Sequence, residues 1–185
     1  MGSVGTSKNP NIMSLVHYTQ EQNIPSLLKS EFDMSRAGEG AGTAWGAGAY
    51  YLEKGSYEDD MYSTRLYTES YIKSDIDTSN FLTVDTLKDT SYRGVGKMYD
   101  DAAKAFPRLI LKDYNKLVRR YKIEGMYSEQ AKKQAFIDTA KHYYEGLIIK
   151  HRVNGGEYID PLSGGNQVVV YNQSAIKNKK AGKNK

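Results

Sequence analysis

The chain has 185 residues, of which 39% are apolar, and this is enough to bury one hydrophobic core. Its 26 basic and 22 acidic side chains give a net charge of +4, and so small an excess does not by itself indicate a polyanionic partner. Because the chain has no cysteine, disulfides and thiolate metal sites are excluded. No apolar run approaches the roughly 18 residues that cross a bilayer, and no secretory signal is visible. We therefore expect a cytoplasmic protein with no membrane partner, acting in its own cell or in a host cell.

The N-terminal part of the chain predicts a leader, a strand and a helix. Residues 1–11 are small and polar, and they predict a flexible leader. Residues 13–18 predict a strand because a short apolar run there is bounded by polar residues. Thr19 then predicts the start of a helix, since Gln22 follows three residues later and would complete a capping box.

A glycine-rich stretch and two further strands follow. Residues 35–48 hold five glycines and predict a loop whose backbone can approach a ligand closely. Residues 48–52 predict the next strand. Residues 53–79 are rich in tyrosine, serine and acidic residues, and we expect a partly helical surface segment there. Residues 80–85 predict another short strand.

The middle of the chain predicts helices. Pro107 suits a first helical position, apolar residues then recur at helical spacing, and Gly125 ends the helix. A second helix is expected from Ser128 to about His142. The polar faces of both helices carry basic residues: Arg108, Lys112, Lys116, Arg119, Lys132 and Lys133. A solvated helix face explains these charges, and a nucleic-acid-binding surface is the alternative.

The last third of the chain returns to strands. Residues 145–150 and residues 167–172 each predict one strand. The lysine-rich residues 177–185 predict a basic, disordered tail. Strands at both ends with helices between them indicate an α+β domain over residues 12–176.

Three short segments each join a polar or aromatic residue to an apolar run. They are residues 15–19 (Leu-Val-His-Tyr-Thr), residues 45–51 (Trp-Gly-Ala-Gly-Ala-Tyr-Tyr) and residues 166–171 (Asn-Gln-Val-Val-Val-Tyr). A polar group beside a buried strand must find a partner, and a ligand is one candidate. A structural explanation is open for each: His17 bonded to a backbone carbonyl, Tyr50 at a strand entry, and Gln167 as the first polar residue of a strand.

The order of the three segments resembles the His–Tyr–Glu framework of ADP-ribosyltransferases that use NAD. The first segment looks like the His-Gly-Thr or His-Gly-Ser strand of the poly(ADP-ribose) polymerase and diphtheria-toxin-like branch. The second is similar to that branch's Gly-x-Gly-Ile-Tyr-Phe, and the third is similar to its Asn-Glu-Tyr-Ile-Val-Tyr. Residues 145–149 look like the Asp-Gly-Ile-Ile strand of related phage and bacterial domains.

This resemblance covers residues 13–62 and 143–176, and it leaves the helical residues 85–142 without a counterpart. It implies an α+β fold, namely an ADP-ribosyltransferase-like split β core with a helical insertion in the middle of the chain. It also implies an effector or toxin of phage or bacterial type, or a module of a polyvalent protein.

The resemblance assigns a role to each matching residue. His17 would bind the NAD ribose, and the backbone of Tyr18, with Thr19 beside it, would hold the nicotinamide carboxamide. Tyr50 would line the nicotinamide pocket. A second tyrosine would stack on the ring, and two positions are candidates: Tyr62 and Tyr57.

Gln167 stands where the family has its glutamate, and Tyr18 stands where a glycine is usual. A glutamine can accept a hydrogen bond from a ribose hydroxyl, but it carries no charge to stabilise a cationic transition state. We therefore expect transfer of a single ADP-ribose from NAD to a macromolecular acceptor, protein or nucleic acid, with release of nicotinamide. Glu157 and Asp160 lie close by in sequence as possible sources of a charge. No metal is expected.

Two alternatives stay open. The first is a module of the same fold that binds NAD or another ligand and turns it over weakly or not at all, which Gln167 suggests. The second is a basic interaction protein that binds nucleic acid through Arg108, Lys112, Lys116 and the tail. Binding by such a protein would fall steeply with salt.

Overall fold

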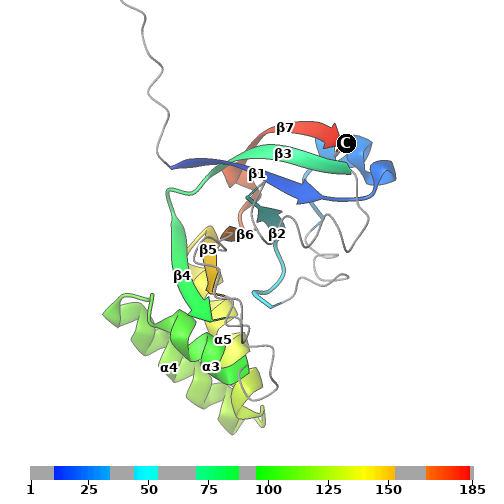
Figure 1. Ribbon diagram of the computed structural model, residues 1–185. Helices are drawn as coiled ribbons and strands as arrows, with labels where there is room; N and C mark the ends of the chain where they lie inside the picture. The colour runs from blue at the N-terminus through cyan, green and yellow to red at the C-terminus, as the bar shows by residue number, and fades with distance from the viewer. Residues whose placement is uncertain (1–10, 34–43, 54–69, 88–94, 153–165, 184–185) are drawn as a thin grey trace, which may run out of the picture.

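We describe a computed structural model of the chain over residues 11–33, 44–53, 70–87, 95–152 and 166–183 (Figure 1). In these residues the protein is a mixed α+β structure. Its strands are β1 (Ile12–Tyr18), β2 (Ala49–Leu52), β3 (Ser70–Asp77), β4 (Phe81–Leu87), β5 (Gly146–Arg152), β6 (Asn166–Val170) and β7 (Ile176–Lys183). Its helices are α1 (Ile24–Lys29), α3 (Val95–Ala103), α4 (Arg108–Ile123) and α5 (Ser128–Tyr143). Short 3-10 turns cover Glu21–Asn23 and Gln173–Ala175.

The described strands form one sheet in the order β4-β5-β6-β2-β1-β3-β7. The pairing of β4 with β5 is parallel, and the other neighbours are antiparallel. Helices α3, α4 and α5 connect the parallel pair, as a crossover connection requires. Figure 1 shows these helices gathered beside β4 and β5, with β1, β3 and β7 at the other end of the molecule.

Of the strand pairings in the sheet, the one between β1 and β2 is the shortest along the described residues. Along the described residues these strands meet at a single pair, Val16 opposite Leu52. By contrast, β1 pairs with β3 at every residue from Ile12 to Tyr18, and β2 pairs with β6 over its whole length. The sheet therefore consists of two well-paired halves that are joined at one position.

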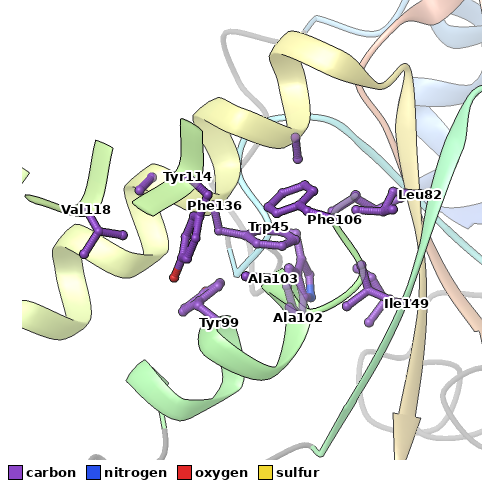
Figure 2. Close-up of a cluster of buried hydrophobic side chains, with 14 of the residues drawn as sticks. Trp45, Leu82, Tyr99, Ala102, Ala103, Phe106, Tyr114, Val118, Phe136 and Ile149 are labelled. Carbon is purple, nitrogen blue, oxygen red and sulfur yellow. The ribbon is translucent and has the colours of Figure 1, made fainter. Parts of the chain in front are cut away.

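The larger hydrophobic core packs the helices against one face of β4, β5 and β6. Trp45 lies in its middle at 1% exposure, with ring centroids 5.4 Å from Tyr99 and 5.5 Å from Phe136 (Figure 2). Phe106 lies 5.1 Å from Phe136 and extends the aromatic cluster. These edge-to-face and tilted contacts are the arrangements that aromatic quadrupoles favour.

A second core covers the opposite face of the sheet. It contains Leu15, Tyr51 and Val168 from three neighbouring strands, and Phe32 and Ala175 close over them. Strand alternation explains the division, because neighbouring residues of one strand, such as Val168 and Val169, point into different cores. The two faces at the β1–β2 junction thus have different surroundings.

Most of the strands and helices expected from the sequence are confirmed. The strands expected near residues 13, 48, 80, 145 and 167 are β1, β2, β4, β5 and β6, and the two central helices are α4 and α5. The prediction that a capping box at Thr19 starts a helix is wrong. The Thr19 N–H donates to the Ser70 carbonyl at 3.1 Å and continues the pairing of β1 with β3, so helix α1 begins only at Ile24.

Two further expectations are wrong. Residues 53–79 were expected to form a partly helical surface segment, but residues 70–77 are strand β3, in which buried residues alternate with more exposed ones. The expected disordered tail is largely β7, which pairs with β3. Its lysines do not prevent this, since charged side chains on an edge strand can stay in solvent while the backbone pairs. The expected leader, apart from Asn11, lies outside the described residues.

Candidate functional site

The three segments singled out in the sequence lie on three neighbouring strands, β1, β2 and β6. Val16, Leu52 and Gln167 stand in one row across these strands. His17 is the next residue after Val16 along β1. Two strand spacings separate Gln167 from β1, so their backbones are about 10 Å apart. The sheet therefore brings together residues that are 150 positions apart in the chain.

His17 lies where the β1–β2 pairing stops. Its Nδ1 is 2.7 Å from the backbone carbonyl oxygen of Tyr50. A carbonyl oxygen can only accept, so Nδ1 carries the proton in this contact. Burial lowers the pKa of His17, and the hydrogen bond to Tyr50 opposes this shift in part. The ring is accordingly neutral at pH 7, and its Nε2 is a hydrogen-bond acceptor.

Aromatic side chains fix the orientation of the His17 ring. Phe32 meets it edge to face at 4.9 Å, and Tyr51 lies at 5.7 Å. Gln173 in turn holds Phe32, because its amide group accepts from the Phe32 N–H and donates to the Phe32 carbonyl. Lys179 of β7 donates to the Leu27 and Ser30 carbonyls near the end of α1 and lies 5.8 Å from the Phe32 ring.

The backbone of Tyr18 faces the β2 side of β1. Because Thr19 donates to Ser70 of β3, the backbone groups of the preceding residue point away from β3. The Tyr18 side chain leans toward β3 instead and meets the Tyr71 ring at 5.9 Å. Tyr71 lies over Gly182 of β7, where an added Cβ would be 2.3 Å from the ring. The Tyr18 ring thus packs along the sheet.

Tyr50 is held by its own turn. Its hydroxyl donates to the Gly46 carbonyl at 2.7 Å and accepts from the Trp45 N–H at 3.2 Å. Gly46 has φ +88°, which favours glycine, and a Cβ on Gly48 would lie 2.8 Å from Val169. These glycines therefore serve a tight turn and close strand packing, whereas the sequence suggested approach to a ligand.

Tyr50 and Gln167 lie on the same face of the sheet, and His17 lies on the other. Tyr50 pairs with Val169, two residues beyond Gln167, so both point toward the core that contains Val169. The His17 ring packs with Tyr51, whose hydroxyl is 3.0 Å from the Ser74 Oγ and whose pKa burial raises to about 12. The three side chains therefore lie near the β1–β2 junction on opposite faces of the sheet, with Tyr50 and Gln167 on one face and His17 on the other.

Several contributors could not be found from the sequence motifs. Three residues contact the side chains near this junction directly or through a neighbour: Phe32, Tyr71 and Gln173. Each of them lies outside the three motif segments. The alternation of residues 70–77 is the signal that would have identified the strand of Tyr71. Four predicted candidates lie outside the described residues: Tyr57, Tyr62, Glu157 and Asp160.

A hollow of about 390 Å³ lies elsewhere, at the end of α5 and the start of β5. Lys141, His142, Glu145 and Tyr171 are among its lining residues, and Lys141 Nζ lies 5.3 Å from the Tyr171 ring centre. Its lining does not include the three motif residues. The hydrogen-bonding geometry at the β1–β2 junction defines the candidate site. Within those ranges no group of three or more His, Asp or Glu side chains could hold a metal ion.

The lowered pKa of His17 predicts an acid-sensitive stability. Below the ordinary pKa of 6.5, the unfolded chain binds a proton that the folded chain excludes, so the free energy of unfolding falls as pH decreases. The slope approaches about 1.4 kcal/mol per pH unit until the folded pKa is reached. We expect His17→Asn, whose amide N–H can replace Nδ1–H, to lose less stability than the natural chain between pH 7.5 and pH 5.5 in urea unfolding. Equal slopes for His17→Asn and the natural chain would contradict the assignment.

No protein-family model, curated protein or solved structure matches this chain. Among the described helices, none is both long and apolar enough to cross a membrane.

Proposed function

We propose that the protein is an NAD-dependent mono-ADP-ribosyltransferase, and that its α+β domain is an ADP-ribosyltransferase-like split β core with α3–α5 as a helical insertion. The observation that carries this proposal is the junction of β1 and β2. A neutral histidine with an accepting Nε2 lies there directly before a backbone segment that faces β2. The single pairing between the two strands supports the split of the core.

The reaction would transfer ADP-ribose in one substitution. The bond between the ribose C1′ and the nicotinamide nitrogen breaks, and its electron pair neutralises the nicotinamide cation. The acceptor nucleophile forms a new bond to C1′ and loses its proton. Between these events the ribose develops positive charge, so the protein must orient the ribose hydroxyls and the carboxamide and stabilise that charge.

The residues at the junction suit the orienting part of this chemistry. His17 Nε2 would accept a hydrogen bond from a ribose hydroxyl, and Phe32 and Tyr51 would keep its ring in place. The backbone N–H and C=O of Tyr18 would pair with the carboxamide, which needs both a donor and an acceptor. Tyr50 would shape the pocket through the turn that its hydroxyl holds.

Gln167 limits the chemistry. Its carbonyl can accept from a ribose hydroxyl, yet it contributes no negative charge to the developing cation. Transfer of a single ADP-ribose to a protein or nucleic-acid acceptor is therefore proposed, rather than synthesis of a polymer. The absence of that charge also favours a second candidate function, in which the same site binds NAD with little or no turnover.

The test is transfer of label from NAD to an acceptor in a cell extract. We expect labelling by the natural chain and a decrease of about 10²-fold in His17→Ala, because a positioned contact in the transition state is lost. His142→Ala, an exposed histidine on α5, is the matched control and should label normally. Equal labelling by His17→Ala and the natural chain would refute the assignment of the site. Calorimetric NAD binding without nicotinamide release would favour the second candidate.

A further inference from the structure

The outer face of α4 carries five exposed cations that the proposed NAD chemistry does not use. They are Arg108, Lys112, Lys116, Arg119 and Lys122, and we call them the basic face of α4. Their spacing of four, four, three and three residues places them on one side of the helix. The opposite side is buried through Tyr114, Val118 and Tyr121. One side of the helix is thus packed in the core, and the other side is exposed to solvent.

The cations of this face have no acidic partner among the described residues. The two acidic residues of the helix and its C-cap are otherwise engaged: Asp113 accepts from the Tyr143 hydroxyl, and Glu124 pairs with Arg120 at 3.5 Å. Elsewhere in the helical region a cation is neutralised, as Lys132 is by Asp100 at 2.5 Å. The basic face of α4 thus gathers five cations without an ion-pair partner among the described residues on one side of a single helix.

Local helix physics does not favour this arrangement. Arg108 and Lys112 stand in the first turns, next to the positive end of the helix dipole. Like charges four residues apart, as in Arg108 with Lys112 and Lys112 with Lys116, repel each other. The face would become favourable if a polyanion bound along it, since phosphates would relieve the repulsion among the five cations, and the dipole would add to their attraction at the N-terminal end.

We propose that the basic face of α4 binds the phosphate backbone of a nucleic acid. The cations extend over about 20 Å of helix at a rise of 1.5 Å per residue, which suits a linear array of phosphates. An anionic membrane is a poor match, because the apolar side of α4 is buried in the core. Leu109 and Ile123 are exposed at 74% and 86% but lie near opposite ends of the helix and form no continuous apolar face.

The test measures binding of a mixed-sequence DNA duplex and of a single-stranded RNA by fluorescence anisotropy between 50 and 200 mM salt, without NAD. If all five cations meet phosphates of the duplex, the logarithm of the binding constant should fall with the logarithm of salt at a slope of about −4.5. The variant Lys112→Gln, Lys116→Gln, Arg119→Gln should reduce this slope by about 3 and weaken binding at least about tenfold at low salt. Because NAD is left out, the result is independent of the proposed transferase activity.

A control variant of equal charge separates this face from general electrostatics. Lys29→Gln, Lys73→Gln, Lys180→Gln removes three exposed cations from α1, β3 and β7, far from α4 in Figure 1, and should bind like the natural chain. Circular dichroism should show that both variants keep the fold. The proposal would be overturned by a natural chain that binds neither probe, by an equal loss in both variants, or by equally tight binding of polyglutamate. Tighter binding of one probe would identify DNA or RNA as the ligand.

Discussion

If the proposed transfer takes place at this junction, the Gln167→Glu variant is expected to cleave NAD about 10²- to 10³-fold faster than the natural chain, because the substitution adds a charge that stabilises the cationic transition state. Gln167 of β6 stands in the row of the sheet that joins the two halves, and the residue of β1 in this row, Val16, directly precedes His17. Glutamate is nearly isosteric with glutamine, so the carbonyl contact to a ribose hydroxyl would be preserved. Nicotinamide release at saturating NAD measures the effect.

Two controls make this result specific. Gln167→Met keeps the length of the side chain without a polar group, and it should fall below the natural chain if the amide orients the ribose. The double variant Gln167→Glu, His17→Ala should lose the gain, because charge alone cannot position the ribose. An unchanged rate in Gln167→Glu would mean that residue 167 does not face the reacting ribose, and the binding function would then be preferred.

Replacing Trp45 by alanine is expected to lower the free energy of unfolding by about 3–5 kcal/mol, the usual cost of removing a large aromatic side chain from a core. Trp45 is 1% exposed and contacts the rings of Tyr99 and Phe136. Its backbone also receives a hydrogen bond from Tyr171, whose hydroxyl donates to the Trp45 carbonyl at 2.7 Å. Urea unfolding followed by circular dichroism measures the loss.

The matched control is Ile123→Ala, a large apolar residue at 86% exposure, which should change stability by less than about 0.5 kcal/mol. A loss below 1 kcal/mol in Trp45→Ala would contradict the central position of the indole. The variant has a further consequence for the site, because the Tyr50 hydroxyl accepts from the Trp45 N–H. Where the variant stays folded, NAD binding should weaken as this turn loosens.

The elements that periodicity identifies well are those with a strong apolar pattern. Helices α4 and α5 follow from apolar residues at helical spacing, and β5 and β6 follow from short runs of leucine, isoleucine and valine. The sequence does not predict strand β3, because tyrosine, serine and aspartate obscure the alternation of apolar and polar residues, although Ile72 and Ile76 are fully buried. A pattern of burial in such a strand depends on which neighbours cover it.

Strand β7 shows a different limit of sequence reasoning. Residues 177–183 are rich in lysine and resemble a solvated tail, yet β3 offers them a free edge. Once paired, Lys177 and Lys183 lie near Asp77 and Glu21, and Lys179 donates to carbonyls near the end of α1. None of these partners is close in sequence, so no local pattern could have predicted the strand.

The sequence also predicts only part of the candidate site. Its three motif residues, His17, Tyr50 and Gln167, follow from the order of the segments, and the uncharged side chain at position 167 is visible in the sequence alone. The tautomer of His17, the aromatic contact with Phe32 and the direction of the Tyr18 backbone depend on contacts across strands. For Gly46 and Gly48, the sequence suggests close approach of a ligand, whereas the structure shows a tight turn and close packing of strands.

By itself, the sequence determined the α+β class, the two central helices and the lack of disulfides, and it proposed the residues of a site, because these depend on composition and local periodicity. Tertiary structure decided where those residues meet. It set β1 beside β2 with a single pair between them along the described residues, and burial there lowers the pKa of His17. It also left the basic face of α4 without an acidic partner among the residues that the structure describes. Hydrogen bonding, burial and charge pairing are properties of neighbours in space, and the sequence orders residues only along the chain.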